Sequence, residues 1–269
     1  MLGLYNSLCH ICVCADVFKV HASFTNFQDT TDLIMNSLKE NGVTQQIHSV
    51  IFDIDGTLVD SNDAHAHAWV QAMAEHGHSV PFDRVRPLIG MGGDKVLPKT
   101  IGVEKESEEG KAISQRRKEI FLSHYLPNLH AFPQAGSLLE YMHARGLRLV
   151  TASSAEKDEL TGLLRIIGPH AEDLFQQETS SQDAKRSKPD PDIMQVALQR
   201  TGCAPEEVVM IGDTAYDISP AAKVAIKTIA FRCGGWSDQD LAGAIAIYDG
   251  PAALLAGYNA SPLGTSAGG

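Results

Sequence analysis

This 269-residue sequence has no long apolar run and no large cluster of basic residues. A membrane-spanning helix needs about 20 consecutive apolar residues, and no stretch approaches that length. The mildly apolar start over 2–20 lacks the basic leader of a secretory signal. The net charge of −11 opposes contact with nucleic acid, and the one basic run, 115–118, lies in a helical pattern that predicts a solvated helix face. We therefore expect neither nucleic acid nor a membrane as a partner.

Cysteines are also few, and their spacing predicts no disulfide framework. Three of the five, Cys9, Cys12 and Cys14, are crowded near the start, whereas Cys203 and Cys233 are isolated. A structural zinc site needs a second pair of ligands at a defined distance, and none follows Cys12 and Cys14. We therefore interpret the cysteines as reduced thiols, and we expect a cytoplasmic location.

Regular patterning is absent from both ends of the chain. We predict that 1–47 form a poorly ordered N-terminal extension, and we hypothesise that Met35 is the real start of translation. The end of the chain, 261–269, is rich in Gly, Ser and Ala and is predicted to be disordered, because it has too little apolar surface to offset the entropy of ordering.

Helix and strand patterns alternate along much of the remaining chain. The short apolar run 48–52 stops at Asp53, as a buried parallel strand does. The segment 62–129 has helical patterns broken by glycine and proline, and we predict a helical insertion there. The flanking segments, 48–61 and 130–260, predict an α/β core with a parallel sheet. Further strands are expected over 147–152, 208–211, 228–231 and 244–248, with helices over 137–144, 158–167, 192–200, 217–224 and 252–257.

Two carboxylates follow the first predicted strand. Asp53 and Asp55 are two apart on an extended segment, so both side chains point to the same side of the chain. Two close carboxylates repel each other, and a hard cation such as magnesium relieves that repulsion. The alternative is a turn in which Asp55 and Gly56 only reverse the chain.

Polar residues follow two other predicted strands. One strand ends at Asp213, and Asp217 lies on the same face of the next helical turn. Another is followed by Ser153 and Ser154, which can donate hydrogen bonds to an anion or simply cap a helix. Lys188 lies in a proline-rich loop, where a lone lysine is usually solvated surface. Because strands of a parallel sheet end at one edge, we expect these residues to converge on one site that has the parts needed for phosphoryl transfer.

Four segments, in this order, resemble the motifs of the haloacid dehalogenase superfamily. They are Asp53-Ile54-Asp55-Gly56-Thr57, Ser153, Lys188 and Gly212-Asp213-Thr214-Ala215-Tyr216-Asp217. The resemblance covers 48–258 and implies a Rossmann-like core with an inserted helical cap. It points to the subfamily that includes phosphoglycolate phosphatases and β-phosphoglucomutases.

The resemblance also implies a reaction through a phosphoryl-aspartate. Asp53 would attack phosphorus, while Asp55 would protonate the leaving oxygen and later deprotonate the hydrolytic water. Lys188 and Ser153, with Ser154 beside it, would hold the phosphoryl oxygens. The implied cofactor is Mg²⁺. Its ligands would be Asp53, the backbone carbonyl of Asp55, Asp213 and, directly or through water, Asp217.

Several alternatives remain open at this stage. Dehalogenation is disfavoured because dehalogenases of this superfamily lack a carboxylate at the position of Asp55. A phosphomutase is suggested by His65 and Trp69, which resemble β-phosphoglucomutases, although His65 also fits simple cap packing. Against a mutase, Gly93 stands where the arginine for a second phosphate would fall, unless Lys95 takes that role. A non-hydrolytic phosphoryl switch is a more distant alternative.

The expected partner is a small phosphorylated metabolite, such as a sugar phosphate or phosphoglycolate. The glycine-rich cap segment 88–99 is expected to set the specificity. Both a monomer and a homodimer are compatible with the sequence.

Overall fold

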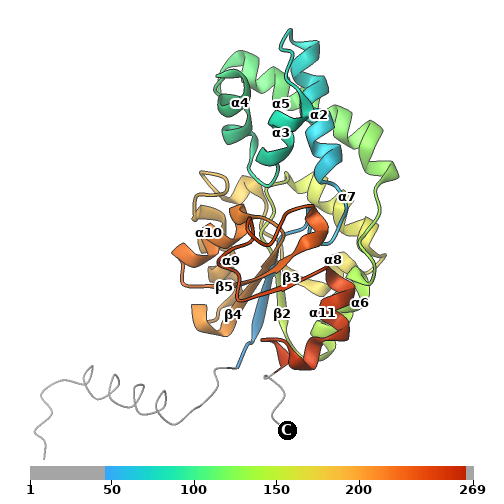
Figure 1. Cartoon of the computed structure of the whole chain (residues 1–269), viewed down its shortest axis with the longest axis vertical. Coiled ribbons are helices and arrows are strands. Elements are labelled where there is room, and N and C mark those ends of the chain that lie inside the picture. The colour runs from blue at the N-terminus through green and yellow to red at the C-terminus, as the bar shows by residue number, and fades with distance from the viewer. Residues whose placement is uncertain (1–45, 265–269) are drawn as a thin grey trace, which may run out of the picture. The chain divides into compact units, whose positions relative to one another are not determined.

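A six-stranded parallel sheet forms the middle of residues 46–264, which are the residues that the computed structural model describes (Figure 1). The strand order is β3-β2-β1-β4-β5-β6, and each neighbouring pair is parallel. The strands are β1 (Ser49–Phe52), β2 (Arg148–Thr151), β3 (Phe175–Gln177), β4 (Val208–Gly212), β5 (Lys227–Phe231) and β6 (Ala246–Tyr248). The predicted α/β fold class with a parallel sheet is confirmed.

Helices cover both faces of the sheet. They are α6 (Ala135–Ala144), α7 (Lys157–Ile167), α8 (Ala171–Leu174), α9 (Asp192–Thr201), α10 (Ala215–Lys223) and α11 (Pro251–Ala256). Because side chains alternate along a strand, neighbouring residues of β1 join different cores. Phe52 packs in a cluster with apolar residues of α6, α7, α8 and α11, whereas Ile51 packs in a second cluster with residues of α9 and α10. Because both faces of β1 are buried, its sequence is a continuous apolar run.

The other α-helices group together at one end of the described residues and form the cap (Figure 1). They are α2 (Asn62–Glu75), α3 (Phe82–Val85), α4 (Gly93–Ile101) and α5 (Glu108–Ile120), and a π-helical turn over Phe121–Tyr125 continues α5. The start of α5 is fixed by Ser107, whose hydroxyl accepts the N–H of Gly110 at 3.0 Å. All four helices lie within 62–129, where the sequence predicts a helical insertion.

The structure adds elements that the sequence patterns did not predict and corrects one end of the chain. β3 and α8 were not predicted, because each has only three or four residues. The disordered tail was expected from 261, but Ser261 and Leu263 are both buried. They are held by a short turn in which Ser261 Oγ accepts the N–H of Leu263 at 3.1 Å.

Several expectations about the ends of the chain lie largely outside the described residues. The hypotheses on Met35 and on Cys9, Cys12 and Cys14 concern residues before 46, as does the predicted extension 1–47 apart from its last two residues, and 265–269 also lie outside. Within 46–264, Cys203 and Cys233 are free thiols. None of the helices described there is long and apolar enough to span a membrane.

Candidate active site

Three neighbouring strands bring the predicted site residues to one edge of the sheet. Phe52 at the end of β1 is in register with Thr151 of β2 and Ile211 of β4. The next residues continue this pairing, since the N–H of Asp53 donates to the carbonyl of Ile211 at 2.9 Å. Asp53, Ser153 and Asp213 therefore follow adjacent strand ends, as parallel topology requires.

Lys188 reaches this edge and is fully buried. Its Nζ donates to Asp53 Oδ1 and to Asp217 Oδ1, both at 2.6 Å. Burial alone would lower the pKa of Lys188, but the charges of Asp217 and Asp53 outweigh burial and raise the pKa above its usual range. The ammonium is therefore a permanent charge beside Asp53. The possibility that Lys188 is only a solvated surface lysine is ruled out.

Asp53, Asp213 and Asp217 form a buried acidic cluster in which one carboxylate oxygen of each residue lies within 4.8 Å of the other two. Burial raises the pKa of Asp53 to about 7, although the charge of Lys188 acts in the opposite direction. Burial, followed by the charges of Asp217 and Asp53, raises the pKa of Asp213 well above its usual range. A hard divalent cation would relieve this repulsion, and the oxygen-only donor set suits Mg²⁺.

Neighbouring polar groups hold the acids of this cluster in place. Asn62 Nδ2 donates to Asp213 Oδ2 at 2.8 Å, and Thr57 Oγ1 lies 3.2 Å from both Asp213 Oδ1 and Asp53 Oδ2. Thr57 has one hydroxyl proton to share between Asp53 and Asp213, whereas both oxygens of Asp217 have protein donors of their own. Oδ1 accepts from Lys188, and Oδ2 accepts from the N–H and hydroxyl of Thr214 at the start of α10.

Two glycines allow the chain to close around Asp213. A Cβ on Gly234 would lie 1.7 Å from Asp213 Oδ2, and a Cβ on Gly56 would lie 2.3 Å from the same atom. Gly56 also has a φ of +75°, a backbone conformation that residues other than glycine rarely adopt. The Asp55-Gly56 turn therefore exists, but it serves to wrap the acidic cluster as well as to reverse the chain.

Asp55 lies beside this cluster and contacts the cap. Its Oδ1 accepts from Ser61 Oγ at 2.5 Å and lies 2.7 Å from His65 Nε2. Burial would raise the pKa of Asp55, but the charge and hydrogen bond of His65, with the Ser61 hydroxyl, lower it overall. The ring of His65 also stacks on Phe121 at 3.9 Å. Both alternatives for His65 are therefore present, since it packs in the cap and contacts the carboxylate.

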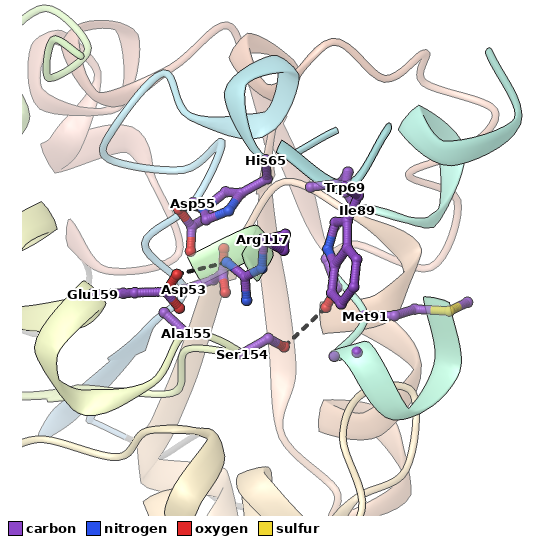
Figure 2. Close-up of a pocket in the computed structure, with 13 residues that line it drawn as sticks. Asp53, Asp55, His65, Trp69, Ile89, Met91, Arg117, Ser154, Ala155 and Glu159 are labelled. Carbon is purple, nitrogen blue, oxygen red and sulfur yellow. Dashed lines mark hydrogen bonds and ion pairs between the residues drawn. The ribbon is translucent and has the colours of Figure 1, made fainter. Parts of the chain in front are cut away.

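A cavity of about 40 Å³ opens above Asp53 and Asp55, between the cap and the core (Figure 2). The cap contributes His65, Trp69, Ile89, Gly90, Met91, Gly92, Gly93 and Arg117, and the core contributes Ser154, Ala155 and Glu159. Ser154 Oγ donates to the carbonyl of Gly90 at 3.0 Å, so the hydroxyl also joins core to cap. Ser153 is buried below, where its Oγ accepts the N–H of Ala155 at 3.0 Å.

The two cap residues considered for a second phosphate differ in position. Gly93 lines the cavity, and a Cβ there would lie 3.0 Å from the Trp69 ring. Lys95 is not among the residues that line this cavity, and its Nζ pairs with Asp190 at 2.9 Å. The structure therefore places no cationic side chain from 93 or 95 in the cavity.

Only part of the basic run at 115–118 is a solvated helix face, and the sequence interpretation is wrong for Arg117 and Lys118. Arg117 Nη1 donates to Glu159 Oε1 at 2.6 Å, and Lys118 Nζ pairs with Glu156 at 2.7 Å. Both partners belong to the core at the start of α7, so the run holds the cap against the core. The sequence carried no signal for these pairs, because acid and base are about 40 residues apart.

Comparison with known proteins agrees with this architecture. The family model described as haloacid dehalogenase-like hydrolase matches residues 50–231, and the chain belongs to this family. Phosphoglycolate phosphatase of Rhodospirillum rubrum is 28% identical over 217 residues, which cover 77% of this chain and 88% of that protein. A phosphorylated carbohydrates phosphatase of Thermotoga maritima is 25% identical over 187 residues, covering 68% and 84%.

A solved structure gives the same result. The crystal structure of a hydrolase from Pseudomonas syringae has a TM-score of 0.72 and 26% identity, and the match covers 79% of this chain and 98% of that one. The predicted family and enzyme class are thereby confirmed, and the chain is a phosphatase of the haloacid dehalogenase-like hydrolases.

Proposed function

We propose that this enzyme hydrolyses a small phosphate monoester, with Mg²⁺, through a phosphoryl group carried on Asp53. The observation that carries the proposal is the buried contact of Asp53 with Lys188 at 2.6 Å, inside an acidic cluster below the cap cavity. The lysine charge disperses the negative charge of the attacking carboxylate and of the phosphoryl group that it receives. A nucleophile, a fixed cation and an adjacent second carboxylate are the parts that phosphoryl transfer needs.

The first half-reaction assigns separate tasks to the two carboxylates. An Asp53 oxygen forms a bond to phosphorus as the bond to the leaving oxygen breaks, and Asp55 gives its proton to that oxygen. Both contacts of Asp55 with Ser61 and His65 go to Oδ1, which leaves Oδ2 to exchange the proton. The bound phosphate raises the pKa of Asp55, because a nearby negative charge favours the protonated acid.

The second half-reaction reverses the role of Asp55. Its carboxylate takes a proton from water, the water oxygen bonds to phosphorus, and Asp53 is released with inorganic phosphate. Lys188 and the backbone and hydroxyl groups of Ser153 and Ser154 are the proposed holders of the phosphoryl oxygens. The cap closes over these steps and keeps other water out.

The proposed metal ligands are Asp53, Asp213 and the backbone carbonyl of Asp55. Asp217 is proposed to act indirectly, because both of its oxygens already accept from Lys188 and Thr214. Mg²⁺ bound there would neutralise charge on the phosphoryl group. Burial, together with the charges of Asp217 and Asp53, raises the pKa of Asp213, and a cation there would relieve this cost, which supports the site.

Simple hydrolysis is supported over phosphomutase activity. Gly93 offers no side chain to a second phosphate, and Lys95 is engaged with Asp190 away from the cavity lining. The substrate proposed is a small metabolite, as for the relatives that act on phosphoglycolate or on phosphorylated carbohydrates. Cytoplasm is the proposed location, and the free thiols of Cys203 and Cys233 fit a reducing compartment.

The test is magnesium-dependent phosphate release from a panel of small phosphate esters, with wild-type enzyme, Asp53→Asn and Asp55→Asn. We expect both substitutions to abolish turnover, and we expect mass spectrometry to detect a phosphoryl adduct in wild type but not in Asp53→Asn. Equal phosphate release by Asp53→Asn would overturn Asp53 as the nucleophile. Isomerisation of a sugar phosphate after priming with a bisphosphate, with no net phosphate release, would favour the mutase.

A further inference from the structure

A second cavity adjoins the active-site cavity at Trp69. Its volume is about 200 Å³, and it shares walls with the first cavity at Trp69, Gly92, Gly93, Arg117 and Ser154. Two lysines line this second cavity but not the first. Lys105 comes from the cap, between α4 and α5, and Lys185 comes from the core, before α9. A leaving group that extends past Trp69 would therefore enter a cavity with one cation from the cap and one from the core.

Lys105 lies next to Gly93, the position at which a cation for a second phosphate is missing. The Cδ of Lys105 would lie 3.7 Å from a Cβ at 93, and a ring carbon of Trp69 would lie 3.0 Å from the same Cβ. Lys105 is half-buried. The methylene groups of a lysine pack on apolar surface, while its ammonium group remains available to a charged partner. A cation is therefore brought to this side of the cap from 105, and not from 93 or 95.

The other charged residues that line the second cavity already have partners of opposite charge. The pairs are Asp94 with Lys95 at 3.5 Å, Glu106 with Lys111 at 3.4 Å, Glu156 with Lys118 at 2.7 Å and Arg117 with Glu159 at 2.6 Å. Lys105 and Lys185 differ, because neither has an ion pair or a hydrogen bond with any residue in 46–264. Two ammonium groups of one cavity therefore have no counter-charge, and an anionic ligand would supply it through charge-assisted hydrogen bonds.

A hydroxyl beside this cavity also lacks a partner. Ser114 of α5 lines the cavity, and its Oγ is buried without a hydrogen-bond partner among the described residues. A buried hydroxyl is unfavourable unless a ligand or water completes its hydrogen bond. A carboxylate or phosphate oxygen can accept from a hydroxyl as well as from an ammonium group. Ser114 and the two lysines are therefore independent features that suit the same ligand.

We propose that Lys105 and Lys185 bind a second anionic group, a carboxylate or a phosphate, at the far end of the substrate's leaving group. The reacting phosphoryl group lies at Asp53, and the carbon chain of the leaving group passes Trp69 into the second cavity. Because one lysine belongs to the cap and the other to the core, the bound anion also favours the closed cap. The proposal rests on the proposed phosphatase function and deepens it, since it names the substrate class as phosphate esters with a second acidic group. Lys105 and Lys185 are then specificity-determining residues.

The test uses two series of phosphate esters, and within a series only the far end of the carbon chain changes from an alcohol to a carboxylate or a phosphate. The shorter series is glycerol 3-phosphate, 3-phosphoglycerate and glycerol 1,3-bisphosphate. The longer series is glucitol 6-phosphate, 6-phosphogluconate and glucitol 1,6-bisphosphate. In at least one series, we expect the wild-type kcat/KM for an acidic ester to exceed that for the alcohol ester by about tenfold or more, because hydrogen bonds to charged groups are the stronger ones. The carboxylate and phosphate members show which acid the site prefers.

Lys105→Met and Lys185→Met remove the charges and keep an apolar stem. Each is expected to lower kcat/KM for the preferred acidic ester by about tenfold, while the alcohol ester of the same series changes by less than about threefold. Lys105→Arg keeps the charge and should retain the preference for the acidic ester. Lys99→Met is the matched control, because Lys99 is an exposed lysine of the cap helix α4 that lines neither cavity. It should change the acidic and alcohol esters in the same proportion.

Two results would overturn the proposal. The first is a wild-type kcat/KM for the acidic esters that does not exceed that for the alcohol ester in either series. The second is a preference for the acidic ester that persists in the variant carrying both Lys105→Met and Lys185→Met, because the lysines would then have no part in the selection. Failure of the proposed function is distinct, since neither these esters nor the wider panel would release phosphate in a manner that depends on Asp53.

Discussion

Closure of the cap should depend on the absence of a side chain at Gly92. Gly92 precedes α4, and its N–H donates to Ser187 Oγ at 3.1 Å. Ser187 also donates to Asp94 of the cap. The next residue is Lys188, whose Nζ contacts Asp53 at 2.6 Å. One short segment therefore joins the cap loop to the cation of the active site.

The effect of Gly92→Ala follows from these distances. The added Cβ would lie 2.6 Å from Ser187 Cβ and 2.8 Å from Asp94 Oδ1, whereas carbon atoms in favourable contact are about 3.5–4.0 Å apart. The loop has to move by about 1 Å, which breaks its hydrogen bond to Ser187. A displacement of about 1 Å in a positioning contact costs roughly 10²-fold in rate, so we expect kcat/KM to fall by that order.

Steady-state phosphate release measures this effect, with thermal unfolding as the companion measurement. Gly92 has a φ of −79°, which alanine tolerates, so the loss should come from the contact and not from backbone strain. Gly168→Ala is the control, because its φ of 166° is extended and its Cβ would meet nothing within 4 Å. Activity of Gly92→Ala within about threefold of wild type would refute the coupling between cap closure and Lys188.

Three further predictions concern the metal site and the core. Asn62→Leu removes the 2.8 Å hydrogen bond to Asp213, so the Mg²⁺ concentration for half-maximal activity should rise about 10- to 100-fold, and an unchanged titration would contradict this. Burial raises the pKa of Asp53 to about 7, so the folded state binds more protons than the unfolded chain. The metal-free Tm should therefore fall as pH rises from about 4 to 7, and Mg²⁺ should restore more of it at pH 7 than at pH 4, as differential scanning fluorimetry with EDTA or Mg²⁺ can show. Ile51→Ala in the fully buried β1 should lower the free energy of unfolding, measured by urea titration, by about 2–5 kcal/mol. The control is Ile245→Ala, which should change it by less than about 0.5 kcal/mol because this residue is 44% exposed.

The sheet and its acidic edge could be predicted from the sequence because the signals are local. Apolar runs that stop at Asp53 and Asp213 mark buried parallel strands, and parallel topology alone places their ends together. β3 escaped prediction because Phe175 is its one apolar residue and it lies at the edge of the sheet. A three-residue edge strand with two exposed glutamines has no pattern that distinguishes it from a loop.

The walls of the cavity could not be predicted, because they depend on contacts between the cap and the core. Arg117 and Glu159 are 42 residues apart, and nothing in a run of basic residues says which of them turns inward. His65 shows the same limit, since helical spacing beside Trp69 predicts packing and says nothing of the carboxylate 2.7 Å from its ring. Specificity therefore depends on tertiary contacts, while the reaction chemistry depends on motifs.

The position of the cavity gives the cap a direct part in the reaction. The cavity above Asp53 has a volume of about 40 Å³ and lies between the cap and the core. A neighbouring cavity of about 200 Å³ shares Trp69, Gly92, Gly93, Arg117 and Ser154 as walls. A leaving group that extends from the first cavity into the second would pass these shared walls. Because Arg117, Gly92 and Ser154 each bond across the junction, opening of the cap to admit substrate would break these contacts, and cap opening is therefore a step that can limit kcat.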